Sequence, residues 1–91
     1  MAVTIKLPTQ LRDAAGNATE AHVDGATVGE ALDSLYERHG ELRQRMSDDG
    51  GGLRRFVNVY LGGEDIRFLE GLDTPVSDGD ELTILPAVAG G

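Results

Sequence analysis

The sequence predicts an α+β domain in which a mixed sheet of about five strands packs on one main helix. Two alternating segments come before one strongly amphipathic segment, and further alternating segments follow it. The 91 residues suffice for one domain with one modest core, since 40% of them are apolar. We therefore expect the element order β-β-α-(α)-β-β-β.

The first two strands are predicted to form a hairpin. Residues 3–7 alternate apolar and polar side chains and stop at Pro8, which is typical of a half-buried strand. Residues 19–24 predict a second strand with Ala21 and Val23 on one face. The stretch DAAGNA between them supplies residues that favour turns.

The main helix has the strongest local signal. Thr27 is a good N-cap, and Glu30 three residues later completes a capping box. We expect Gly40 to end the helix in a left-handed conformation, and residues 41–46 to form a second short helix. Helical spacing places one apolar set on a single face: Val28, Ala31, Leu32, Leu35 and Tyr36.

The second half of the chain predicts three more strands. Residues 47–52 read as a flexible glycine linker, and residues 55–61 form the most β-prone run. Gly62-Gly63 predicts a tight turn into a short return strand at residues 65–68. Asp78-Gly79 predicts a hairpin-type turn that leads into a last strand. That strand, residues 81–85, alternates cleanly and stops at Pro86.

Composition and charge exclude several classes of site. The chain has no cysteine, which rules out disulfides, thiolate metal sites and a cysteine nucleophile. Its net charge of −8 argues against nucleic acid and anionic membranes and fits a protein partner with a basic surface. His22 and His39 lack the spacing of metal ligands. With no membrane-length apolar run and no signal segment, we expect a cytoplasmic monomer.

Three stretches carry a resemblance to a known family: IKLPTQLR, RFVNVYLGGEDIRF and ILPAVAGG. Together they resemble the MoaD/ThiS family of ubiquitin-like sulfur carriers over the whole chain, and most closely its CysO-type branch, which serves cysteine synthesis. The resemblance implies a β-grasp fold over residues 1–85 and a flexible C-terminal tail over residues 86–91.

The same resemblance implies a protein co-substrate rather than an enzyme. An ATP-dependent enzyme similar to the ubiquitin-activating one would use ATP and Mg to adenylate Gly91, and a sulfurtransferase would convert it to a thiocarboxylate. No cofactor would stay bound to the chain. The acceptor would be an enzyme such as a pyridoxal-phosphate-dependent O-phosphoserine sulfhydrylase, followed by a zinc peptidase. Alternatives are molybdopterin, thiazole or thiosugar synthesis, a ubiquitin-like modifier, or a non-covalent binding module.

The tail residues fit passage through a narrow enzyme channel. Gly90 and Gly91 have no Cβ, so their backbone approaches a partner closely. Ala87, Val88 and Ala89 are small and uncharged. Pro86 cannot donate to the sheet ladder and is expected to release the tail.

A partner-binding patch is predicted at the start of this tail. If alternation turns Val57 and Val59 inward, then Phe56, Tyr60 and Leu85 form one exposed apolar patch on neighbouring strands. For Phe56, a position inside the small core is nearly as good an interpretation.

Overall fold

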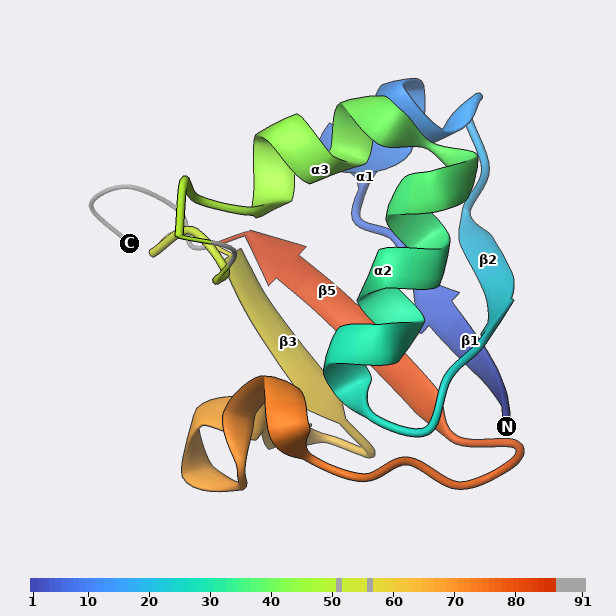
Figure 1. Cartoon of the computed structure of the whole chain (residues 1–91). Coiled ribbons are helices and arrows are strands. Elements are labelled where there is room, and N and C mark those ends of the chain that lie inside the picture. The colour runs from blue at the N-terminus through green and yellow to red at the C-terminus, as the bar shows by residue number, and fades with distance from the viewer. Residues whose placement is uncertain (51, 56, 87–91) are drawn as a thin grey trace.

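A five-stranded mixed sheet carries helices on one of its faces in the computed structural model, which describes residues 1–50, 52–55 and 57–86 (Figure 1). The strand order is β2-β1-β5-β3-β4. β1 pairs in parallel with β5, and the other neighbours pair antiparallel. The predicted α+β class and mixed sheet are therefore confirmed. The strands are β1 (Ala2–Lys6), β2 (Glu20–Asp24), β3 (Val57–Leu61), β4 (Glu64–Asp65) and β5 (Glu81–Pro86).

The main helix α2 (Val28–Arg38) crosses the sheet and is capped as predicted. Thr27 Oγ1 accepts a hydrogen bond from the backbone N–H of Glu30 at 3.1 Å. The carboxylate of Glu30 accepts in return from the N–H of Ala26 at 3.0 Å, one residue before the cap. The first bond satisfies a donor that the first helical turn leaves open, and the second ties the residue before the cap to the helix. The other helical segments are α1 (Thr9–Arg12), η1 (Asp13–Ala15), α3 (Gly40–Met46), η2 (Ile66–Phe68) and η3 (Gly71–Asp73).

The core lies between the sheet and the helices α2 and α3. The apolar face of α2 is buried over the five predicted positions. Leu42 and Met46 of α3 extend this layer and are fully buried. From the sheet, alternate residues point into the same core, including Val3, Ile5, Val23, Val59, Leu82 and Ile84.

The connection between β1 and β2 is more structured than the predicted hairpin turn. α1 and η1 occupy it, because Leu11 and Ala15 bury their side chains in the core. The Arg45 guanidinium bonds both carboxylate oxygens of Asp13 at 3.0 and 3.1 Å and so ties η1 to α3. The Arg45 side chain also holds the pKa of Asp13 below its ordinary value.

Gly40 does not end α2 in a left-handed conformation, so that prediction is wrong. His39 is the C-cap, and its N–H donates to the Leu35 carbonyl at 2.9 Å. Gly40 instead begins α3. This early restart of the helix lets Leu42 and Met46 reach the core.

The predicted return strand at residues 65–68 is wrong in most of its length. Only Glu64 and Asp65 pair with β3, and the chain then turns into the 3-10 helix η2. The Asp65 carboxylate caps η2 by accepting from the backbone N–H of Arg67 at 2.9 Å. The cap ends the strand, and Ile66 is buried as a result.

One predicted turn and the predicted linker also have a different form. Asp78-Gly79 is a turn, with Gly79 at φ 89°, but it does not join two paired strands. It fastens the N-terminus, since Gly79 N–H donates to Ala2 O at 2.7 Å and Ala2 N–H donates to Asp78 Oδ1 at 2.8 Å. In the predicted linker, Asp48 Oδ1 accepts from the N–H groups of Gly50 and Gly52, so the loop is closed by hydrogen bonds.

Over the described ranges, no helix is long and apolar enough to span a membrane.

Candidate functional site

The outer face of β3 and β5 brings two of the three predicted patch residues together. Val57 and Val59 are buried, so Asn58 and Tyr60 lie on the opposite face of β3. Register pairs Asn58 with Leu85, which is 45% exposed, and Tyr60 with Thr83. Tyr60, which is half-buried, and the exposed Leu85 are therefore diagonal neighbours on one surface, and we call it the outer face.

Pro86 lies within β5, one residue beyond the predicted end of the strand, and pairs with Val57, so the prediction that Pro86 releases the chain from the sheet is wrong. Gly62 N–H donates to the Glu81 carbonyl, so the backbone groups of residues 81, 83 and 85 point toward β3. Alternation then turns the Pro86 nitrogen to the other side, where β1 has already ended at Lys6, opposite Thr83. The missing N–H of Pro86 therefore breaks no ladder bond, and the proline is compatible with a central strand.

The remaining predicted site residues lie outside the described part of the chain. These are Phe56, Ala87, Val88, Ala89, Gly90 and Gly91. Their roles stay predictions. What the structure adds is the position from which the tail departs, because Pro86 pairs with Val57 of β3.

A polar cluster that the sequence analysis missed borders the outer face. The Arg67 guanidinium donates to the side-chain oxygen of Asn58, and its Nε and Nη2 donate to the two Asp65 carboxylate oxygens at 3.3 and 3.2 Å. We call Asn58, Asp65 and Arg67 the arginine clamp. Asp65 lies opposite the half-buried Tyr60 in the ladder, so the clamp adjoins the outer face.

The clamp has an electrostatic consequence for Asp65. The backbone N–H of Arg67 is the largest cause that lowers the pKa of this carboxyl, and the Arg67 side chain lowers it further. The only sequence signal was the spacing of Asp65 and Arg67, which allows an Asp side chain to cap the backbone two residues on. The contact to Asn58 has no local signal, because it depends on how η2 folds back along β3.

A hollow of about 600 Å³ lies beside β5, beyond the end of β1. Lys6, Arg12, Glu20 and Leu85 contribute to its lining. Arg12 is fixed there, since its Nε donates to the Leu7 carbonyl at 3.1 Å. The hollow continues the outer face toward the N-terminal half of the molecule.

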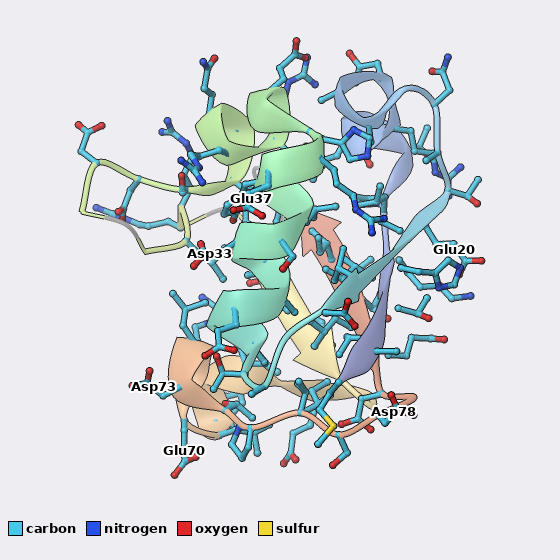
Figure 2. All side chains as sticks on the ribbon, turned by 45° about the vertical axis from the view of Figure 1, so that its right-hand side comes forward. Glu20, Asp33, Glu37, Glu70, Asp73 and Asp78 are labelled. Carbon is cyan, nitrogen blue, oxygen red and sulfur yellow. The ribbon has the colours of Figure 1, made fainter. Side chains whose placement is uncertain are left out.

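The histidines and acids are dispersed. His22 Nδ1 lies 3.1 Å from Thr4 Oγ1 on β1, whereas His39 caps α2. Among the residues that the structure describes, no three His, Asp or Glu side chains are grouped to hold a metal. Figure 2 shows outward-pointing acids on several elements rather than in one cluster: Glu20, Asp33, Glu37, Glu70, Asp73 and Asp78.

Comparison with known proteins identifies similar chains. The model of the ThiS family matches residues 5–91. The sulfur carrier protein CysO of Mycobacterium tuberculosis is 43% identical over 93 aligned residues that cover 100% of both chains. Small archaeal modifier protein 1 of Haloferax volcanii is 41% identical and covers 94% of this chain and 97% of its own.

Solved structures agree with these relatives. A BexX/CysO complex from Amycolatopsis orientalis matches with a TM-score of 0.91 and 48% identity, over 99% of this chain and 100% of the matched one. CysO from Mycobacterium tuberculosis matches with a TM-score of 0.87 and 41% identity, over 94% and 99%. The fold is thus the ubiquitin-like β-grasp that the sequence resemblance implied.

Proposed function

The chain belongs to the ThiS family, and we propose that it carries sulfur as a thiocarboxylate on Gly91 and delivers it to cysteine synthesis. It is a sulfur carrier, a co-substrate of other enzymes rather than a catalyst. The observation that carries this conclusion is the 43% identity to a CysO carrier along the full length of both chains.

The chemistry requires activation of the terminal carboxylate. A carboxylate is a poor electrophile, so an oxygen of Gly91 attacks the α-phosphorus of ATP and pyrophosphate leaves. A sulfide equivalent then attacks the acyl carbon, AMP leaves, and a thiocarboxylate anion remains. ATP and Mg belong to the activating enzyme in this proposal, and the carrier binds no cofactor stably. The anion is a soft nucleophile that attacks an electrophilic carbon of the acceptor.

The described residues support the delivery of this group. β5 lies between β1 and β3, and it holds Pro86 in the sheet immediately before the tail. Because Pro86 belongs to β5, the proposal takes residues 1–86 as the domain and residues 87–91 as the part that enters the enzyme. Tyr60 and Leu85 contact the enzyme while Ala87, Val88, Ala89 and Gly90 thread its channel, because small residues let the backbone approach closely.

Partner enzymes follow from the same proposal. The relative from Amycolatopsis orientalis was solved as a complex of CysO with BexX, which supports docking of this carrier on enzymes too. We assign it an activating enzyme, a sulfurtransferase and an acceptor of the O-phosphoserine sulfhydrylase class, with a zinc peptidase to release cysteine. The carrier would act as a monomer in the cytoplasm.

Intact-mass spectrometry tests the proposal. The carrier is incubated with a cognate activating enzyme, MgATP and sulfide. The expected result is a mass gain that corresponds to exchange of one oxygen for one sulfur, located by fragmentation at Gly91. A control without ATP should show no gain. An unchanged terminal carboxylate in the complete mixture would overturn the proposal.

A second function is favoured by one relative. The 41% identity to small archaeal modifier protein 1 supports covalent attachment of the tail to lysines of other proteins. Lys6 is the single lysine of this chain, which limits conjugation to itself. Fragments in which Gly91 is joined to a foreign lysine would establish this function, and their absence from a proteome rich in the thiocarboxylate form would exclude it.

A further inference from the structure

A second pocket lies on the side of β3 away from β5. It has a volume of about 360 Å³ and extends between the segment before β3 and the helices η2 and η3. Val57, Val59 and Ile66 form its buried floor, and the half-buried Leu53 and Leu72 form its walls. The interior of the pocket is therefore apolar.

Three arginines surround this apolar interior. Arg54, Arg55 and Arg67 line the pocket, so three of the eight basic residues meet at one place in a chain of net charge −8. Arg54 Nε donates to the Gln44 carbonyl at 3.1 Å, which fixes this side chain, and Arg67 is held in the arginine clamp. Among the described residues that line the pocket, Asp65 is the one acid. We call this the arginine-rimmed pocket; its charge and its interior suit an apolar ligand that ends in an anion.

The tail has this chemistry and starts within reach. Val57 lines the pocket and pairs with Pro86 across the ladder. The five residues after Pro86 have the sequence AVAGG and lie outside the described residues. Fully extended, such a segment spans about 17 Å. On the proposed function, it ends in a carboxylate or thiocarboxylate.

We propose that the arginine-rimmed pocket binds the carrier's own tail between enzymes, with the small apolar side chains on its floor and the terminal anion against the arginines. This inference rests on the proposed function for the identity of the terminal group. Binding lowers the exposure of the reactive end to water and to oxidants. Exposed ion pairs are weak and screened by salt, so an enzyme displaces the tail easily.

The hollow beyond the end of β1 is the competing site. Lys6 and Arg12 line it, but Glu20 offsets part of their charge. In the arginine-rimmed pocket, Asp65 and Arg67 compensate each other, which leaves the charges of Arg54 and Arg55 for an anion, against one uncompensated cation in the lining of the hollow. Charge therefore favours the arginine-rimmed pocket for an anionic tail.

The experiment compares full-length carriers that differ only in the terminal group. Cleavage of an intein fusion with hydroxide, ammonia or sulfide gives the acid, the amide and the thiocarboxylate of the same chain. Two-dimensional NMR spectra at low salt should differ between acid and amide at the Nε–H groups of Arg54, Arg55 and Arg67 and at the methyls of Leu53 and Leu72. These differences should shrink at about 0.5 M salt, where charges are screened.

Two outcomes of this comparison would overturn the inference. Differences confined to the last residues would mean that the tail binds nowhere on the domain. Differences at Lys6 and Arg12 would place it in the other hollow. The NMR comparison uses no activating enzyme. If no enzyme forms the thiocarboxylate on this carrier, the proposed function is refuted, but the NMR evidence on where the tail binds still stands.

A charge reversal provides the second readout. Arg55→Glu should speed hydrolysis of the thiocarboxylate about two- to fivefold, the loss expected for one exposed ion pair. Arg38→Glu makes the same charge change at the exposed end of α2 and should leave the rate unchanged. Equal hydrolysis rates in both variants and in the parent chain would refute protection by the pocket.

Discussion

Asn58 of β3 lies directly opposite Leu85 of β5 on the outer face. The Arg67 guanidinium binds Asn58, whereas Leu85 is 45% exposed. A hydrogen-bonded polar side chain, Asn58, thus lies beside an exposed apolar side chain, Leu85, near the end of β5. This pair combines the two kinds of contact that anchor a protein interface.

Leu85→Asp is expected to weaken docking without unfolding the domain. Truncation or charging of an interface anchor costs about 1–2 kcal/mol, so the KM for the carrier in adenylation should rise about 5- to 30-fold with kcat unchanged. Pyrophosphate release against carrier concentration measures both constants. Phe68→Asp is the matched control, because it adds the same charge at a side chain that is 84% exposed on η2. The same KM for both variants would argue against this role of the outer face.

An alanine added after Gly91 is expected to abolish thiocarboxylation. The added residue removes the carboxyl from the position that the channel allows, while the domain is untouched. Gly90→Val should lower the rate of thiocarboxylation, because the added side chain prevents the backbone from approaching the activating enzyme closely. Intact-mass spectra of timed reactions report both effects. Normal sulfur loading of the extended chain would contradict the role given to the terminus.

Asp65→Asn is expected to change the acid sensitivity of the fold. The folded-state pKa of Asp65 lies below 3.8, chiefly because the Arg67 backbone N–H binds the carboxylate. A depressed pKa stabilises the fold at higher pH, and this stability is lost as the pH falls below that ordinary value. The Asp65→Asn variant should therefore have a lower free energy of unfolding than the parent chain at neutral pH, and this free energy should fall less as the pH is lowered. Urea unfolding across the acid range measures this, with Asp73→Asn as control; parallel curves for parent and Asp65→Asn would count against the clamp.

Tyr36→Phe is expected to remove a loss of stability in alkali. Burial is the largest cause that raises the pKa of Tyr36 to about 12, nearby Asp33 adds to it, and Arg43 opposes it. A raised pKa leaves stability intact below the ordinary value of 10 and lowers it as the pH rises from there toward the folded-state value. Because solvent screens part of this shift, we expect the loss of stability to be about 1–2 kcal/mol. Denaturant midpoints from about pH 9 to pH 12 should fall less steeply in the variant, and an unchanged slope would refute the assignment.

Gly25→Ala is expected to destabilise the domain by about 3 kcal/mol. A Cβ at Gly25 would lie 2.5 Å from the Ala31 backbone nitrogen at the start of α2, and backbone cannot move aside cheaply. Gly40→Ala is the matched control, because nothing lies within 4 Å of its Cβ position. It should stabilise α3 by up to about 1 kcal/mol. Thermal unfolding measures both variants; a Gly25→Ala variant as stable as the parent chain, or a Gly40→Ala variant that is less stable, would contradict these expectations.

Local periodicity was sufficient to predict the main elements. Alternation in residues 57–61 and 81–85 correctly separated buried Val59 and Ile84 from the outer face. The Thr27 cap and the apolar stripe of α2 were also correct, because both depend on neighbours in sequence. The same alternation correctly predicts that Tyr60 and Leu85 lie on one surface.

Contacts between distant segments were not predictable from local patterns. Leu11 lies in the short helix α1, which the residue pattern did not predict, and its side chain is buried in the core. Arg67 reaches Asn58 only because the Asp65 cap ends β4 after two residues. The arginine-rimmed pocket likewise joins residues before β3 with residues of η2 and η3, and no sequence spacing connects them.

The central position of β5 has a mechanical consequence. An enzyme that draws the tail into its channel pulls along the axis of this strand. The hydrogen bonds to β1 on one side and β3 on the other then resist the force together, in shear. An edge strand such as β4 would instead peel away bond by bond. We therefore expect the domain to stay folded when an enzyme pulls on its C-terminal end.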